Sequence, residues 1–289
     1  MLRWLLIGPL LVACSDKRAS EVKVCPDARA CFDLGRVLKV TGDVAGAYAV
    51  YRRGCDELAG APENCFSVAL LASGDDYVML PATIPPDKAK AQHYYEKACE
   101  RGMGDGCANA GVHLVQESAM SRGYELLDKS CSMKSGLGCY NLGVAVRDGS
   151  GVVADRIRAA TLFEQACAYE YGGGCRNLGL ALMKGDGVVQ DPKRAVPLLE
   201  KACSLTPKLC FDVALAHELG DGVTKDLGRA RQLYDKGCTA GDMFACTNLA
   251  SYLADGLGGP RDASGAIRLA KAACDSGVKL ACDNLPTMR

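Results

Sequence analysis

Sixteen of the seventeen cysteines fall into eight close pairs, and this recurrence constrains the fold more than any other feature of the sequence. The pairs are Cys25 with Cys31, Cys55 with Cys65, Cys99 with Cys107, Cys131 with Cys139, Cys167 with Cys175, Cys203 with Cys210, Cys238 with Cys246 and Cys274 with Cys282. From Cys131 onward, the first member of each pair recurs after 36, 36, 35 and 36 residues. A fixed period of this size is typical of repeat proteins whose units stack into a solenoid.

Two segments in each repeat show helical periodicity, and the first follows the second cysteine of a pair. It carries the pattern C-x-N-L-G, complete at Cys139 and Cys175, and ends at a Gly-rich turn such as Gly-Asp-Gly-Val at 185–188. After seven of the eight second cysteines, the residue four positions on is Gly or Ala: Gly35, Ala69, Gly111, Gly143, Gly179, Ala214 and Ala250. We expect this small residue to let a neighbouring backbone approach closely.

The second segment starts at an aspartate that lies twelve residues before a first-of-pair cysteine. These aspartates are Asp43, Asp87, Asp155, Asp191, Asp226 and Asp262. Asp is a favourable N-cap because its carboxylate accepts the free N–H groups of the first helical turn. Each repeat is therefore predicted to be helix A, turn, helix B. The expected fold is an all-α, α/α superhelical solenoid of about seven helix hairpins over residues 25–289.

The cysteines flank the turn from helix B to the next helix A, where antiparallel helices bring their ends together. The spacing is mostly C-x₇-C, whereas zinc sites favour C-x₂₋₄-C. The three histidines, His93, His113 and His217, do not recur with the cysteines, and no C-x-x-C redox motif is present. We therefore predict eight short-range disulfides, no metal and no cofactor.

The N-terminus does not follow the repeat pattern. One arginine precedes a short apolar run there, which is typical of a signal peptide. Leu11-Val12-Ala13-Cys14 resembles the lipobox of bacterial lipoproteins. That resemblance implies a signal peptide at 1–13, a lipidated Cys14, a tether at 14–24 and, with Ser15 next, the outer membrane facing the periplasm or the cell surface. An ordinary signal peptide is the alternative. Export suits a disulfide framework.

The motifs N-L-G, G-D-G-V, D-x-x-[KR]-A and K-A-C together resemble Sel1-like repeats, which are relatives of the tetratricopeptide repeat. The paired cysteines resemble the secreted, cysteine-rich branch of that family. The resemblance implies a non-catalytic adaptor that holds proteins or peptides. Two units depart from the pattern: the one starting at Cys107 has Ala119 in place of the Asp cap, and another carries a proline-rich insertion at 73–87.

A solenoid presents a concave face, which helices A usually line. The residues late in helix A that are candidates for this face are Arg147, Asp148, Lys184, His217, Glu218, Tyr252 and Asp255. The repeated asparagines, Asn109, Asn141, Asn177 and Asn248, either bind a peptide backbone or bond neighbouring turns. The expected partner is a protein or peptide, with the membrane reached through the lipid anchor and peptidoglycan a further candidate. Equal numbers of basic and acidic residues, 34 each, argue against nucleic acid.

The alternative is a protein that binds or hydrolyses cell-wall fragments or β-lactams, because some cysteine-rich relatives carry such labels. Ser276 and Lys279 spell S-x-x-K, the nucleophile motif of serine β-lactamases. The supporting S-D-N and K-T-G motifs are absent from the sequence, which favours chance. The sequence therefore predicts a scaffold and not an enzyme.

Overall fold

The computed structural model describes residues 25–74 and 84–285. The predicted signal peptide, the lipidation site Cys14, the tether and most of the insertion lie outside these ranges. The chain divides into two compact units, unit 1 up to Glu117 and unit 2 from Ser118 onward. The boundary falls in the repeat that the sequence marks as irregular.

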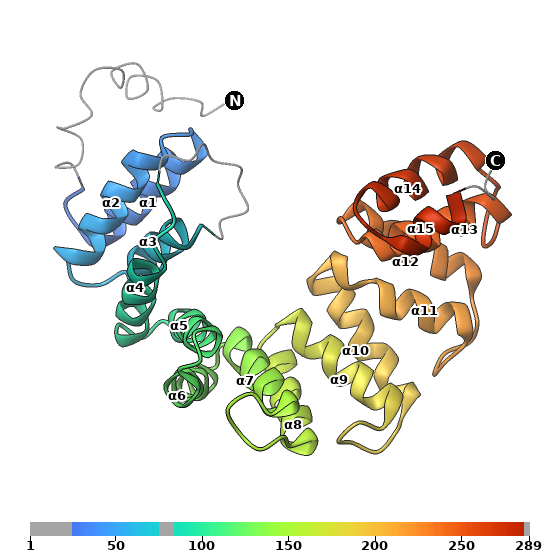
Figure 1. The fold of residues 1–289 in the computed structure, drawn as a ribbon, viewed down its shortest axis with the longest axis horizontal. Coiled ribbons are helices and arrows are strands. Elements are labelled where there is room, and N and C mark those ends of the chain that lie inside the picture. The colour runs from blue at the N-terminus through green and yellow to red at the C-terminus, as the bar shows by residue number, and fades with distance from the viewer. Residues whose placement is uncertain (1–24, 75–83, 286–289) are drawn as a thin grey trace, which may run out of the picture. The chain divides into compact units, whose positions relative to one another are not determined.

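The described residues form α-helices and one 3₁₀ helix, with no strand among them (Figure 1). Unit 1 contains α1 (Ala28–Val40), α2 (Val44–Asp56), α3 (Glu63–Ser73), α4 (Lys88–Glu100) and α5 (Gly104–Gln116). Unit 2 contains α6 (Met120–Ser132), α7 (Gly136–Asp148), α8 (Arg156–Ala168), α9 (Gly172–Lys184), α10 (Pro192–Leu205), η2 (Pro207–Leu209), α11 (Phe211–Leu219), α12 (Leu227–Thr239), α13 (Met243–Asp255), α14 (Ala263–Asp275) and α15 (Lys279–Asn284). The all-α solenoid prediction is confirmed. Within the described ranges, no helix has both the length and the apolar character needed to cross a bilayer.

Successive helices alternate between the predicted A and B positions, with odd numbers for helix A and even numbers for helix B. All six predicted aspartates cap a helix B, each accepting from the backbone N–H three residues later: Asp43, Asp87, Asp155, Asp191, Asp226 and Asp262. Helix α6 begins after Ala119, which makes no side-chain cap bond. We call the end of a hairpin where A passes to B the turn end, and the opposite, disulfide-bearing end the staple end.

The staple end holds a disulfide between the two members of every predicted cysteine pair, with Cα atoms 4.4–5.0 Å apart. The eight disulfides are Cys25–Cys31, Cys55–Cys65, Cys99–Cys107, Cys131–Cys139, Cys167–Cys175, Cys203–Cys210, Cys238–Cys246 and Cys274–Cys282. Five of the eight join cysteines eight positions apart, and the separations are 6 for Cys25–Cys31, 7 for Cys203–Cys210 and 10 for Cys55–Cys65. The half-cystines Cys31 and Cys246 are buried, whereas Cys282, in the last described helix, is only partly buried.

Small residues beside the cysteines allow this close approach. The residues that precede the two cysteines also meet, because the two Cα atoms are so near. A Cβ on Gly174 would lie 2.4 Å from the Cβ of Ala166, and one on Gly138 would lie 2.0 Å from Oγ of Ser130. At these two staples, the close approach therefore requires small residues before the cysteines.

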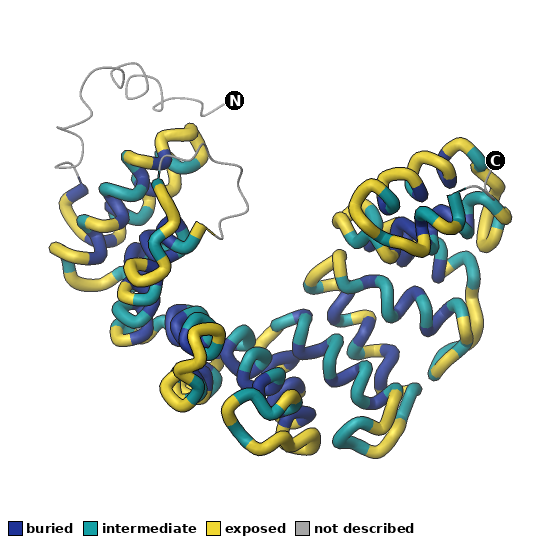
Figure 2. Tube along the Cα trace, in the orientation of Figure 1, coloured by how far each residue is buried: buried dark blue, intermediate teal, exposed yellow. Residues whose placement is uncertain are grey.

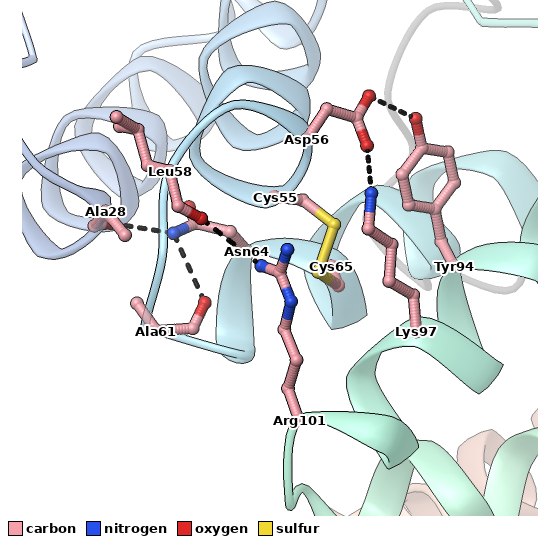
Figure 3. The surroundings of a disulfide bond; sticks show 10 residues. All are labelled: Ala28, Cys55, Asp56, Leu58, Ala61, Asn64, Cys65, Tyr94, Lys97 and Arg101. Atoms are coloured by element: carbon pink, nitrogen blue, oxygen red, sulfur yellow. Dashed lines mark hydrogen bonds and ion pairs between the residues drawn. A yellow bond between two sulfur atoms is a disulfide. The ribbon is translucent and has the colours of Figure 1, made fainter.

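The Cys55–Cys65 staple reaches the same packing with a different residue (Figure 3). Asn64 precedes Cys65 and is fully buried, with its Nδ2 donating to the carbonyl of Ala28 at 2.7 Å. Its amide occupies the space that a Cβ on Gly54 would fill, at 2.6 Å. The larger side chain of Asn64 is accommodated because the residue that faces it, Gly54, has no side chain.

Beside this staple, the carboxylate of Asp56 joins α2 to α4 (Figure 3). It accepts from Nζ of Lys97 at 2.6 Å and from the hydroxyl of Tyr94 at 2.8 Å. Burial tends to raise the pKa of Asp56, but the two hydrogen bonds outweigh it and lower that pKa. These bonds connect two consecutive helices B within unit 1.

The small residue four positions past the second cysteine faces a side chain of helix B, and at Gly179 the backbone oxygen of Ala195 also comes within 3.3 Å of an added Cβ. A Cβ on Gly143 would lie 2.8 Å from the ring of Phe163, and one on Gly179 would lie 2.8 Å from Leu199. These partners stand four residues before a first-of-pair cysteine. The buried side chains at this position are Tyr51, Tyr95, Leu127, Phe163, Leu199, Tyr234 and Ala270. Buried positions accordingly follow the facing sides of the helices, with exposed positions mainly at turns (Figure 2).

At the turn end, the second glycine of each Gly-x-Gly turn packs against the start of the preceding helix B. Gly187 has φ +73°, and a Cβ there would lie 2.2 Å from the carbonyl oxygen of Arg156. Gly222 repeats the arrangement, with φ +73° and 2.1 Å to the carbonyl oxygen of Pro192. Only glycine tolerates both the left-handed backbone and the missing space. The turn backbone is therefore as constrained as the staple.

Candidate functional site

One face of each helix A in unit 2 carries different chemistry from repeat to repeat. We define this A-helix face by the residues two, five, six and nine positions after the second cysteine, which share a side of the helix. In α9 these are Asn177, Leu180, Ala181 and Lys184, and in α7 they are Asn141, Val144, Ala145 and Asp148. In α11 they are Asp212, Leu215, Ala216 and Leu219, and in α13 they are Asn248, Ser251, Tyr252 and Asp255.

A pocket of about 130 Å³ opens where the A-helix face of α9 meets α7 and α8. It is lined by Arg147, Arg156, Ala159, Ala160, Phe163, Asn177, Leu180, Ala181, Lys184 and Asp186. The floor is apolar, since Ala160 and Phe163 are buried. The rim holds three cations, one aspartate and one amide. All of these residues belong to unit 2.

Two of the three rim cations are neutralised by neighbouring aspartates. Arg147 makes a bidentate contact with Asp148, with Nε–Oδ1 at 2.7 Å and Nη2–Oδ2 at 3.0 Å. This hydrogen bonding raises the pKa of Arg147 and lowers that of Asp148. Arg156 donates from Nη1 to Oδ1 of Asp186 at 2.6 Å. Both pairs are partly exposed, so each contributes little to stability.

The third cation and the amide have no such partner. Within the described ranges, Lys184 forms neither a hydrogen bond nor an ion pair, and the side chain of Asn177 makes no hydrogen bond. Lys184 is exposed and Asn177 is half-buried. The rim therefore carries one uncompensated positive charge beside an amide that can both donate and accept.

The structure brings three of the predicted binding residues together. Arg147 and Lys184 line the pocket, and Asp148 pairs with Arg147 at its edge. Asp255 lies exposed on the equivalent face of α13, outside this pocket. The sequence analysis missed Arg156 and Asp186, which come from the first turn of helix B and from the Gly-rich turn. The close packing of Gly187 on the backbone of Arg156 brings the Gly-rich turn, and with it Asp186, next to Arg156.

The other three predicted residues are not available on an open face. His217 is 8% exposed because it falls seven residues after Cys210, where the other repeats place apolar residues such as Val146 and Leu182. Tyr252 is 3% exposed and packs edge-on against Tyr234, with ring centroids 5.4 Å apart.

Glu218 is engaged in the same packed region. It accepts the hydroxyl proton of Tyr234 at 2.6 Å, and burial together with this bond raises the pKa of Tyr234. Nε2 of His217 lies 3.9 Å from Oε1 of Glu200, beyond hydrogen-bond distance. The prediction that His217 and Tyr252 reach a binding face is wrong. The position of His217 along α11 places its side chain in the core, and the ring of Tyr234 covers Tyr252.

The S-x-x-K tetrapeptide forms no catalytic arrangement in the structure. Ser276 lies exposed on the turn after α14, and Lys279 is the exposed first residue of α15. Oγ of Ser276 donates to the carbonyl of Ala272 at 2.9 Å. Neither residue lines the pocket. Among the described residues, no group of three or more His, Cys, Asp or Glu side chains is placed to hold a metal ion.

Solved structures share the fold. A Sel1 repeat protein from Oxalobacter formigenes superposes with a TM-score of 0.68 at 21% identity, covering 91% of this chain and 76% of that one. The protective antigen c5321 of uropathogenic Escherichia coli, which displays an SLR fold, gives 0.66 at 21% identity over 90% of this chain. The present chain spans 56% of the antigen's length. Yeast Tom70 gives 0.55 at 16% identity, over 93% of this chain and 56% of its own.

No curated protein matches the sequence. The family model described as Sel1 repeat matches residues 69–103, 136–168, 173–206, 207–242 and 244–278, which together make up more than half of the chain. The eight disulfides fit the cysteine-rich branch of these proteins. The chain belongs to the Sel1 repeat family.

Proposed function

We propose that this protein is a non-catalytic adaptor that binds a segment of another protein and is held by a lipid at Cys14 on the periplasmic side of a bacterial envelope. Sel1 and tetratricopeptide-like repeats generally mediate protein–protein interactions. The observation that carries the proposal is the pocket on the A-helix face, where unpartnered polar groups rim an apolar floor. Small-molecule and peptide sites combine these two features.

The compartment is inferred from the covalent chemistry. Eight disulfides stapling every hairpin suit an oxidising environment, because cytosolic thiols are kept reduced. The apolar run before Cys14 suits export, and acyl chains on Cys14 would anchor the protein to a membrane surface. The outer membrane is the proposed location because Ser15 follows the cysteine.

A cross-linked pull-down from intact envelopes tests the adaptor role. The full-length chain carries a C-terminal tag, and captured proteins are quantified by mass spectrometry. We expect one or two proteins in stoichiometric amount, reduced in a variant whose pocket is filled, Ala181→Tyr. A matched control, Leu215→Tyr, alters the equivalent face of α11 and should leave capture unchanged.

Two results would contradict this function. Recovery of the protein with isolated peptidoglycan sacculi, independent of any other protein, would indicate a structural link to the cell wall. Turnover of a chromogenic β-lactam that disappears in a Ser276→Ala variant would indicate an enzyme. The same tagged preparation serves both assays, so the three functions are separated in one set of samples.

Membership of the envelope is tested separately by labelling. Cells fed a radiolabelled or alkyne fatty acid should incorporate the label into the wild-type chain but not into a Cys14→Ser variant. Retention of label in the variant, or its absence from the wild type, would remove lipid anchoring from the proposal while leaving the adaptor role to the pull-down.

A further inference from the structure

We propose that the outward face of α1 lies on the lipid surface to which Cys14 anchors the chain. This inference rests on the lipid anchor of the proposed function and specifies which face of unit 1 meets the membrane. Three observations support it: two exposed valines on one side of α1, arginines on the same side, and the short stretch of sequence between Cys14 and the first described residue.

The outward face of α1 combines apolar and basic side chains. We define it by the exposed residues of the helix, which recur at helical spacing and share one side: Arg29, Asp33, Arg36, Val37 and Val40. The opposite side of the helix holds its buried residues: Ala28, Cys31 and Gly35. The helix is therefore attached to unit 1 along one side and presents the outward face to solvent.

The apolar part of this face consists of two valines in contact with solvent. Val40 is 88% exposed and Val37 is 55% exposed, and they stand three residues apart. Two valines cannot supply the roughly 800 Å² that each partner of a stable protein–protein interface buries. A lipid interface is the occupant that suits them, because single apolar side chains can enter it while neighbouring arginines stay among the headgroups.

The basic part of the face favours anionic headgroups. The guanidinium groups of Arg29 and Arg36 lie 5.5 and 5.9 Å from the ring centre of Phe32, which keeps both of them beside the valines. Arg29 also pairs with Asp33 at 3.4 Å, whereas Arg36 forms no ion pair with a described residue. One positive charge of the face is therefore uncompensated and would be attracted to lipid phosphates.

The sequence before α1 limits how far the helix can be from the anchor. Cys25 follows Cys14 by 11 positions. Since an extended chain spans at most about 3.6 Å per residue, the two are at most about 40 Å apart. Helix α1 has 13 residues and is about 20 Å long, so its whole outward face can reach the anchoring surface. A tether this short raises the effective concentration, so a contact too weak to form from solution is populated.

The test uses tryptophan fluorescence of the lipidated chain in vesicles. The sequence has one tryptophan, Trp4, which lies in the predicted signal peptide and would be removed with it. Val40→Trp then places a single reporter on the outward face. The matched control is His93→Trp, at an exposed position of α4, which follows α3 along the solenoid (Figure 1). Each purified chain is reconstituted into phosphatidylcholine vesicles, with or without phosphatidylglycerol, that contain brominated lipid as the quencher.

We expect the brominated lipid to quench the emission of the Val40→Trp variant and not that of the His93→Trp variant. Quenching should be stronger with phosphatidylglycerol and weaker at high salt. Adding Arg36→Gln to the Val40→Trp variant should weaken the contact with phosphatidylglycerol vesicles roughly fivefold. Adding Lys88→Gln instead, which removes an exposed charge from α4, should leave the quenching unchanged.

Three outcomes would overturn the inference. The first is unquenched Val40→Trp emission in every vesicle, and the second is equal quenching of the Val40→Trp and His93→Trp variants. The third is Val40→Trp emission that changes with protein concentration and not with lipid, which would indicate a second copy of the chain on this face.

Flotation of the vesicles separates this failure from failure of the anchor. A chain that floats with the vesicles but is not quenched would keep the lipid anchor and lose the contact of α1. A purified chain that carries no acyl group by mass spectrometry and does not float would remove both the anchor and this inference. The adaptor role is independent of either result, since the envelope pull-down tests it.

Discussion

The staple end and the turn end of the hairpins in unit 2 obey different rules. At the staple end, side chains repeat: every pair of cysteines is bridged, and the neighbouring residues are held small by contacts such as Gly174 against Ala166. At the turn end, the repeated residues are the glycine that meets the preceding helix B and the aspartate that caps the next one, and both of them fix the backbone. The side chains beside that backbone change from repeat to repeat.

This difference indicates where a repeat protein can carry specificity. A substitution at the staple end disturbs a covalent bond and a close contact, so the chemistry there is bound to the fold. Positions such as Lys184 protrude from a backbone that is already fixed, so their chemistry can change at little cost in stability. Variants at the staple end should therefore change stability, and variants of the side chains at the turn end should change binding. Each of the following variants tests that separation.

The largest effect is expected for Gly187→Ala, which changes the turn backbone itself. The new Cβ combines a left-handed φ of +73° with an approach of 2.2 Å to the carbonyl oxygen of Arg156. We expect a loss of about 3 kcal/mol in the free energy of unfolding, measured by urea titration. Gly241→Ala is the matched control, because Gly241 has φ +86° with open space around it, and should cost about 1 kcal/mol. Equal losses in the two variants would show that the close approach is unimportant.

Removal of one staple, Cys167→Ala with Cys175→Ala, comes next. Loss of a loop this short should lower the free energy of unfolding by about 2.5 kcal/mol in the chain-entropy model. Because the pocket opens toward the other end of α8 and α9, partner capture by the folded variant in the envelope pull-down should change less than twofold. A variant that unfolds at the wild-type urea concentration, or one that folds but no longer binds, would break the division between the ends.

An intermediate effect is expected for the helix cap Asp226→Ala. Its carboxylate accepts from the backbone N–H of Arg229 at 2.9 Å, and the loss of such a cap costs about 1 kcal/mol. Asp221→Ala, in the same turn but with no cap bond, controls for the lost charge and should cost less than about 0.5 kcal/mol. Indistinguishable urea midpoints for these two variants would show that the cap bond of Asp226 does not stabilise the fold.

The smallest effect on stability is expected for Lys184→Ala. The side chain is exposed and lacks a partner within the described ranges, so the free energy of unfolding should move by less than about 0.5 kcal/mol. Capture of the partner in the envelope pull-down should nevertheless weaken roughly tenfold. A thermal melt run beside the pull-down measures both effects, and a destabilised variant would mean that Lys184 supports the fold instead.

The staple end was predictable from sequence because its determinants are local and repeat. Cysteine spacing predicted the disulfides, and at the turn end an aspartate twelve residues before six of the first cysteines predicted the start of helix B. What Gly143 makes room for was not predictable, since the ring of Phe163 reaches it from the next helix. Periodicity places a residue on a face but does not say which side chain of another helix lies opposite.

The pocket was only half predictable for the same reason. Arg147 and Lys184 stood out as charged residues late in helix A, whereas Arg156 and Asp186 join them only through the packing of one turn on the preceding helix B. His217 and Tyr252 looked equivalent to them by position along the helix. His217 is buried because it stands seven residues after its cysteine, at a position that faces the core. Tyr252 is buried because the ring of Tyr234 packs against it.

The most direct test of the division between the ends is a two-dimensional ¹H–¹⁵N NMR titration of the full-length chain with the partner protein that the envelope pull-down identifies. We expect amide shift changes to cluster at Arg147, Arg156 and residues 177–186, around the pocket. The amides of Cys167 and Cys175, at the staple end, should stay in place. Shifts centred on the staple cysteines, or no saturable shift at any residue, would contradict the claim that the turn end carries binding while the staple end carries the fold.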